Sequence, residues 1–211
     1  MRSRLSHCQA HNLNMNEKLK SELVRMVEEE RRLNEELAND GSLYEGYPPR
    51  IRELHLNQAN ELERIVETVG WPKSSMVGKE GADAAWLILQ HSISRPDFIK
   101  KCFPIFQSAV NEDEASARHL SCLIDGICYF SRKPQVYGNY FDWNENGEFG
   151  PWIIEDPDNV NERRAQVGLN TLEERIKEME DDLRKNKLSP PKDYFKRQSE
   201  MNDFLKEVGW I

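Results

Sequence analysis

The fold of this chain is decided by residues 84–91, which read Ala-Ala-Trp-Leu-Ile-Leu-Gln-His. Six apolar residues in a row fit a helix over 82–92 that is apolar on nearly every face. Such a helix has to be covered by its neighbours, so we expect it to be the central buried element. Its last two polar residues, Gln90 and His91, mark the place where the helix leaves the core.

Amphipathic helices are predicted on both sides of this stretch. Apolar residues recur there at three- and four-residue steps among charged ones, which is the period of a helix with one buried face. Breaks fall at Asn39-Asp40-Gly41, Gly70-Trp71-Pro72 and Pro190-Pro191, where glycine and proline end helices. A turn-rich connector is expected over 73–81, and Asn170 is expected to cap a late helix. The predicted helices span residues 16–38, 50–68, 82–92, 96–111, 115–130, 158–167, 171–186 and 192–208.

One small β-hairpin is predicted after the fifth helix. Residues 135–141 are aromatic and β-prone, and Asn146-Gly147 is a strong signal for a hairpin turn. Gly150-Pro151 keeps the returning strand irregular or at an edge, because proline lacks a backbone donor. We expect a hairpin and not a larger sheet.

These elements predict a mainly α fold, an irregular helical bundle with one small β-hairpin. At 211 residues the chain is long enough for one domain with a real core. We expect a disordered extension over 1–14, because Met15 stands just before the first convincing helix. The rest, 15–211, is expected to be a single helical domain. Its expected parts are a helical hairpin over 15–69, central helices over 70–134, the β-hairpin over 135–155 and C-terminal helices over 156–211.

The composition argues against several classes of protein. A net charge of −8 disfavours nucleic-acid binding, which needs lysines and arginines to displace the counterions of phosphate. The apolar runs are far shorter than the about 20 residues of a membrane-spanning helix, and the N-terminal residues lack the apolar core of a secretory signal. We therefore expect a cytoplasmic protein that binds neither nucleic acid nor membrane.

No metal site is predicted, and the cofactor is unknown. The four cysteines, expected as reduced thiols in the cytoplasm, show no zinc-binding spacing. Asp142-x-Asn144-x-Asn146-Gly147 matches the first half of a calcium loop, but its twelfth position, which needs a carboxylate, is Ile153. We interpret these residues as a hairpin turn. Phosphate-binding glycine loops and the hydrolase nucleophile elbow are also absent.

Two polar side chains, His91 and Asp125, fall in otherwise apolar helices. At the end of its helix His91 is either a satisfied core histidine, favoured by the negative helix end, or a catalytic or ligand-binding group. The carboxylate of Asp125 must be paired, raised in pKa or facing a cavity. A partner such as Arg118 or Arg132 would make Asp125 structural, and a cavity would make it functional.

Several short segments resemble the motifs of a bacterial family of uncharacterised proteins, known only as a domain of unknown function. The resemblance covers roughly residues 16–176, and its motifs include Gly70-Trp71-Pro72, Ala84-Ala85-Trp86-Leu87, Gln90-His91 and Gln135-Val136-Tyr137-Gly138. It implies a polar cluster of Gln90, His91, Asp125, Gln135, Tyr137 and Arg163 or Arg164. The family motifs carry an arginine where this chain has Gly126, and Thr-Gln where it has Asn139-Tyr140, which points to a divergent or inactive member.

The leading hypothesis is an intracellular protein with a polar pocket around His91, Asp125 and Gln135, either an enzyme of unknown reaction or a ligand-binding protein. In it, His91 is a general base or a ligand-orienting group, and Asp125 orients His91 or the substrate. The other implied residues would bind the ligand: Gln90, Gln135, Tyr137, Arg163 and Arg164.

Two alternatives stay open beside the pocket. One is an acidic binding module, such as an immunity protein or antitoxin, that neutralises a basic protein partner. It would use the acidic stretch around the hairpin, because no lysine or arginine occurs between Asn139 and Asn161. The other is a dimerising module that pairs through the first two helices. The chain is accordingly expected to be a monomer or a homodimer.

Overall fold

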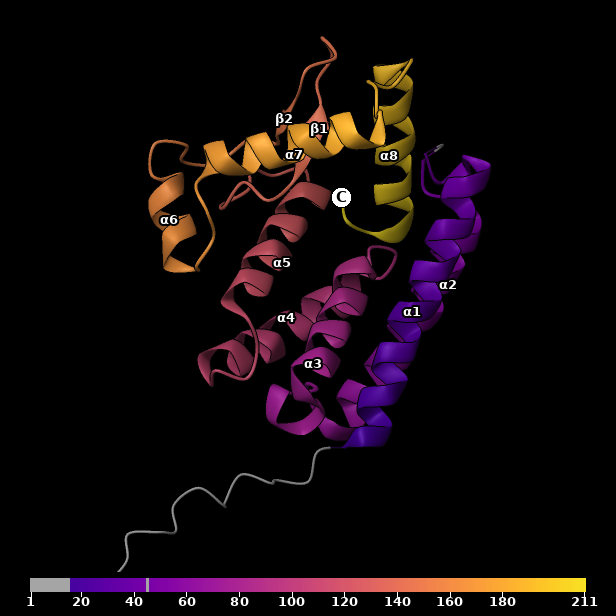
Figure 1. Cartoon of the computed structure of the whole chain (residues 1–211), viewed down its shortest axis with the longest axis vertical. Coiled ribbons are helices and arrows are strands. Elements are labelled where there is room, and N and C mark those ends of the chain that lie inside the picture. The colour runs from indigo at the N-terminus through magenta and orange to yellow at the C-terminus, as the bar shows by residue number, and fades with distance from the viewer. Residues whose placement is uncertain (1–15, 45) are drawn as a thin grey trace, which may run out of the picture. The chain divides into compact units, whose positions relative to one another are not determined.

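The computed structural model describes residues 16–44 and 46–211 (Figure 1). Within these residues the chain forms eight α-helices, one short 3-10 helix and one antiparallel sheet of two strands. The predicted mainly α fold with a small β-hairpin is thereby confirmed. The extension expected over 1–14 lies outside the described residues. None of the described helices has both the length and the apolar character needed to cross a membrane.

By its internal contacts the chain divides into two compact units, which we describe separately. The first unit comprises the described residues up to Ser92 together with Asn111–Ala115, and the second comprises Ile93–Val110 with Ser116–Ile211. The expectation of a single domain over 15–211 stays a prediction.

The first unit is built from three long helices that pack on one another (Figure 1). The ion pair Glu36–Arg50, 2.9 Å, joins the end of the first helix to the start of the second, and Glu22–Arg64, 3.9 Å, joins their opposite ends. The two helices are therefore antiparallel, as the sequence predicted. The elements of the unit are α1 (Glu17–Asp40), η1 (Ser42–Tyr44), α2 (Pro49–Val69) and α3 (Ser74–His91).

The buried faces of α1 and α2 each contain polar residues among apolar ones. On α1 the buried residues are Leu19, Leu23, Met26, Glu30 and Leu37. On α2 they are Ile51, His55, Gln58, Ala59, Leu62, Ile65 and Val66. Glu30 and His55 stand at positions where the helix period calls for an apolar side chain. The same periodicity that packs the two helices thus carries both side chains into the interior.

The third helix differs from its prediction in two ways. It begins at Ser74 and not at residue 82, because a helical turn precedes Gly78, whose backbone (φ 68°, ψ 168°) interrupts the helix. Glycine tolerates this positive φ without strain. The helix is also not covered on every side, since Leu87 and His91 are only half-buried. Its exposed side carries part of the site described below.

The second unit combines helices with the hairpin. The strands pair with Phe141 opposite Pro151 and Trp143 opposite Phe149, and the side chain of Asn144 closes the turn by accepting the N–H of Asn146 and of Glu148, at 3.0 and 2.9 Å. The elements are α4 (Pro96–Asn111), α5 (Ala117–Phe130), β1 (Phe141–Trp143), β2 (Phe149–Pro151), α6 (Val160–Gln166), α7 (Leu172–Asn186) and α8 (Tyr194–Val208).

The start of α7 corrects one detail of the sequence analysis. Its N-cap is Thr171, which forms a capping box with Glu174, and not Asn170. The backbone carbonyl and side chain of Asn170 instead accept hydrogen bonds from Arg164. Threonine followed three residues later by glutamate is the usual signature of a capping box, so the sequence did contain the signal.

Candidate functional site

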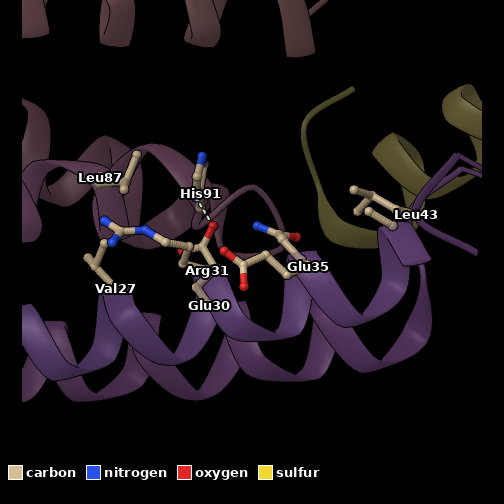
Figure 2. A pocket seen from close by; sticks show the side chains of 9 residues that line it. Val27, Glu30, Arg31, Glu35, Leu43, Leu87 and His91 are labelled. Atoms are coloured by element: carbon tan, nitrogen blue, oxygen red, sulfur yellow. Dashed lines mark ion pairs between the residues drawn. The ribbon is translucent and has the colours of Figure 1, made fainter. Parts of the chain in front are cut away.

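A buried carboxylate lies between two histidines in the first unit. Glu30 Oε1 of α1 is 2.7 Å from His91 Nδ1 at the end of α3 and 3.3 Å from His55 Nε2 of α2. The side chain of Glu30 is 3 % exposed, whereas that of His91 is 34 % exposed. Figure 2 shows Glu30 and His91 facing each other, with the other ring nitrogen of His91 directed away from Glu30. We call these three residues the Glu30 cluster.

The two histidines keep Glu30 ionised despite its burial. Burial alone would raise the pKa of this carboxyl group, but its contacts with His55 and His91 outweigh that effect and lower the pKa to about 2. A carboxylate that stays charged inside a helical core is a strong ligand for any cation or donor that reaches it.

The contacts within the Glu30 cluster leave polar atoms unsatisfied. His55 Nε2 and His91 Nδ1 are close to Oε1, yet neither is aligned to form a hydrogen bond with it, and Oε2 is buried with no partner among the residues that the structure describes. Buried polar atoms in folded proteins are nearly always paired. The cluster therefore has unused capacity to bind a polar group.

Neighbouring side chains hold the cluster in place. The Tyr47 hydroxyl is 2.9 Å from His55 Nδ1, which fixes the direction of that ring. Gln58 Nε2 donates to the Met26 carbonyl at 2.7 Å, one turn before Glu30 on α1. Because both contacts are at least partly buried, they restrict how far the cluster residues can move.

An open pocket of about 450 Å³ lies beside the Glu30 cluster (Figure 2). This volume is within the range of roughly 300–1,000 Å³ common for small-molecule sites. Glu30 and His91 belong to its wall, so the polar atoms of the cluster adjoin a space that a ligand can enter. The lining residues are Val27, Glu30, Arg31, Asn34, Glu35, Ala38, Leu43, Leu87 and His91.

The second predicted residue, Asp125, has a different environment. Its carboxylate accepts the backbone N–H groups of Val136, Tyr137 and Asn139 at 2.8, 3.0 and 2.9 Å. Burial raises the pKa of Asp125, and these donors counteract part of the rise. The carboxylate thus holds the loop after α5, and its partners are backbone amides and not the arginine that the sequence suggested.

Gln135 and the two arginines complete the same loop support. Gln135 donates to the carbonyls of Tyr140 and Trp152 and accepts the N–H of Tyr140, each at 2.9 Å. Arg164 is fully buried and donates to the Tyr137 carbonyl at 2.7 Å. Together with Asp125 these residues form what we call the Asp125 cluster, whose further members are Tyr137, through its backbone, and Arg163, which donates to the Val136 carbonyl at 2.9 Å.

The predicted site residues are thus divided between the two units. Asp125, Gln135, Tyr137, Arg163 and Arg164 come together in the second unit, whereas Gln90 and His91 belong to the first. A pocket shared by His91 and Asp125 stays a prediction. Gln90 Oε1 is buried and, among the described residues, lacks a hydrogen-bond partner.

Sequence reasoning missed Glu30, His55 and Tyr47. A detectable signal existed for the first two, since a glutamate and a histidine interrupt the apolar stripes of their helices. Nothing in the sequence indicated that these two positions would meet His91.

Gly126 of α5 lies against the side chain of Tyr140. A Cβ atom at Gly126 would lie 2.7 Å from the Tyr140 hydroxyl oxygen, which is closer than real Cβ contacts come. The tyrosine therefore fills the space that a side chain at 126 would need.

Comparison with known proteins identifies a family for this chain and no individual relative. No curated protein and no solved structure gave a match. A family model described as a family of unknown function (DUF6624) matches residues 17–187, a segment that contains both polar clusters. The chain therefore belongs to this family of unknown function.

Proposed function

We propose that this protein binds a small molecule in the pocket beside the Glu30 cluster. The observation that carries the proposal is the polar floor of that pocket, where Glu30 and His91 lie together and one buried carboxylate oxygen has no partner among the described residues. Ligand sites commonly combine apolar walls with a few such polar groups.

The lining suggests the chemistry of the ligand. Val27, Leu43 and Leu87 provide an apolar wall, while Arg31 and Glu35 supply exposed charges of both signs. A small amphipathic organic molecule matches this lining, with its apolar part on the leucines and its polar group toward His91. In this arrangement His91 orients the ligand through the ring nitrogen that faces away from Glu30 (Figure 2).

Thermal-shift measurements test this proposal. Purified protein is screened against nucleotides, amino acids, sugars and organic acids, and a compound that binds the folded state raises the Tm. Each compound that does so is then tested on Ala38→Phe, which fills the pocket, and on Ala165→Phe, the same change at an exposed position of α6. We expect the shift to persist in Ala165→Phe and to vanish in Ala38→Phe. A shift of equal size in both variants would contradict binding at this pocket.

A second candidate function is recognition of a basic protein segment by the hairpin of the second unit. A pocket of about 460 Å³ there is lined by the rings of Trp143, Phe149, Trp152 and Tyr194 together with Glu148. Exposed acidic residues accompany it, and no lysine or arginine occurs between Asn139 and Asn161. Aromatic faces beside carboxylates attract lysine and arginine side chains.

A labelled arginine-rich peptide tests this second function. Its Kd is measured by fluorescence anisotropy at low and high salt, beside a peptide with glutamate in place of arginine. We expect weaker binding in high salt and in the double variant Glu145→Gln/Glu148→Gln, with no change in the control Glu180→Gln/Glu200→Gln on α7 and α8. Equal binding by both variant proteins would contradict recognition by the hairpin.

A further inference from the structure

We propose that Glu30, His55 and His91 bind a divalent transition-metal ion. Each side chain comes from a different helix and offers one ligand atom, and these three atoms all lie within 4.8 Å of one another. The inference rests on the proposed function in one respect, because the ion would lie at the floor of the same pocket. The sequence predicted no metal site from its cysteine spacing or its calcium-loop match, and this cluster has neither feature.

The donor set indicates the kind of ion. Two imidazole nitrogens and one carboxylate oxygen suit Zn²⁺ and other first-row transition metals. Calcium and magnesium prefer sites made of oxygen atoms alone. Zn²⁺ is therefore the appropriate probe for this site.

The distance between Glu30 and His55 fits a common metal geometry. Two ligands of a tetrahedral ion bound at about 2.0–2.1 Å are separated by roughly 3.3 Å, and Glu30 Oε1 lies 3.3 Å from His55 Nε2. The distance from Oε1 to His91 Nδ1 is shorter, 2.7 Å, so these two atoms must separate slightly when the ion binds. His91 is half-exposed at the last residue of α3, where such a movement meets little resistance.

The lack of hydrogen bonds within the cluster also supports a bound metal ion. Both ring nitrogens approach Oε1 without being aligned for a hydrogen bond, and Oε2 has no partner among the described residues. The three side chains are thus close together without being hydrogen-bonded to one another, which leaves a point between them where one ion can bind. A cation at that point would receive a lone pair from each of the three side chains and would neutralise the buried carboxylate.

The surroundings provide the support and the opening that a metal site needs. When His55 Nδ1 donates its hydrogen to Tyr47, 2.9 Å away, Nε2 keeps the lone pair that binds a metal, and such outer contacts commonly orient metal-bound histidines. Three protein ligands leave a fourth position for water or a ligand. Because Glu30 and His91 also line the pocket, that position would be reached from there.

Calorimetric titration of the untagged, metal-free, full-length chain with Zn²⁺ tests the proposal. We expect one ion per chain, and we expect Glu30→Gln, His55→Gln and His91→Gln each to weaken binding about 100-fold or more. Tyr47→Phe, which removes only the supporting contact, should weaken it about 10-fold. The control His119→Gln makes the same type of change in the second unit and should leave the Kd unaltered.

Residues near the N-terminus need their own control, because His7, Cys8 and His11 also carry metal-binding atoms. A chain with alanine at these three positions should bind Zn²⁺ as the wild type does. Loss of binding in that chain, unchanged binding in the cluster variants, or no binding by the wild type would each overturn the proposal. Circular dichroism in EDTA shows whether each variant is folded, and Tyr47→Phe still tests the site if a cluster variant is not.

The outcomes separate this proposal from the proposed function. Ligand shifts are measured once in EDTA and once with Zn²⁺. A compound that shifts the Tm in EDTA, combined with no Zn²⁺ binding, supports the pocket and overturns the metal site. Zn²⁺ binding that depends on the cluster, combined with no compound that shifts the Tm in either condition, supports the metal site and removes the support for the small-molecule proposal.

Discussion

The two buried polar clusters of this protein use their charges in opposite ways. In the Asp125 cluster the carboxylate and its neighbouring arginines bond to backbone groups of the loop after α5. In the Glu30 cluster the side chains face one another, and a carboxylate oxygen is left without a partner among the described residues. A cluster whose polar atoms are hydrogen-bonded to the backbone supports the fold. A cluster with unused atoms beside a pocket is better suited to binding.

The largest effect on stability is expected at Arg164. Arg164→Ala removes a fully buried guanidinium that donates to the carbonyls of Tyr137 and Asn170, and these acceptors would be left unpaired. We expect the free energy of unfolding to fall by about 3–5 kcal/mol, measured by urea denaturation. Arg184→Ala, at an exposed position of α7, is the matched control and should cost less than about 1 kcal/mol. Similar losses in both variants would contradict a supporting role for the Asp125 cluster.

A smaller loss is expected at Asp125. In the wild type, backbone N–H groups donate to the carboxylate of Asp125. In Asp125→Asn one of the two acceptor oxygens is replaced by an NH₂ group, which is itself a donor. We expect a loss of about 2–3 kcal/mol, with Asp158→Asn as the exposed control. Zn²⁺ and pocket ligands should bind this variant as they bind the wild type. Urea denaturation with and without ligand checks this, because bound ligand should raise the free energy of unfolding of both proteins equally. Loss of ligand binding here would show that the two clusters work together, as the sequence analysis predicted.

The neutral variant of Glu30 should cost about as much as Asp125→Asn and less than Arg164→Ala. Glu30→Gln keeps the shape of the side chain but loses the charge, whose contacts with the two histidines lower the pKa of Glu30 to about 2. In EDTA we expect a loss of about 2–3 kcal/mol. A loss as large as that of Arg164→Ala would indicate that the Glu30 cluster is mainly structural.

The smallest expected effect concerns pH: the contributions of Glu30 and Asp125 to stability should change with pH in opposite directions. The pKa of Glu30 is lowered to about 2 in the folded protein, so its contribution is present above the unfolded pKa of about 4.5 and is lost as pH falls toward 2. The pKa of Asp125 is raised, so its contribution is present below the unfolded pKa and is lost as pH rises through the folded value. We measure stability in urea in EDTA between pH 4 and 6. As the pH falls from 6 to 4, the free energy of unfolding of the wild type should exceed that of Glu30→Gln by less and less. Over the same range it should exceed that of Asp125→Asn by more and more.

The sequence predicts local elements better than the partners of buried charges. Helix periods predicted α1 and α2, and Asn146-Gly147 predicted the hairpin, because these signals depend on neighbouring residues. His91 and Asp125 were identified because each is polar within an apolar helix. Their partners were not identified, since Glu30 lies 61 residues before His91 in the chain and Asp125 binds backbone amides, which any residue type can supply.

Urea unfolding of the wild type, Glu30→Gln and Asp125→Asn, each with Zn²⁺ and with EDTA, distinguishes a binding role from a supporting role for each cluster. An ion that binds only the folded state adds about 2.7 kcal/mol when its concentration is 100 times the Kd. We expect this gain for the wild type and for Asp125→Asn, and none for Glu30→Gln. An equal gain in all three proteins, or no gain in any of them, would contradict the assignment of binding to the Glu30 cluster and of support to the Asp125 cluster.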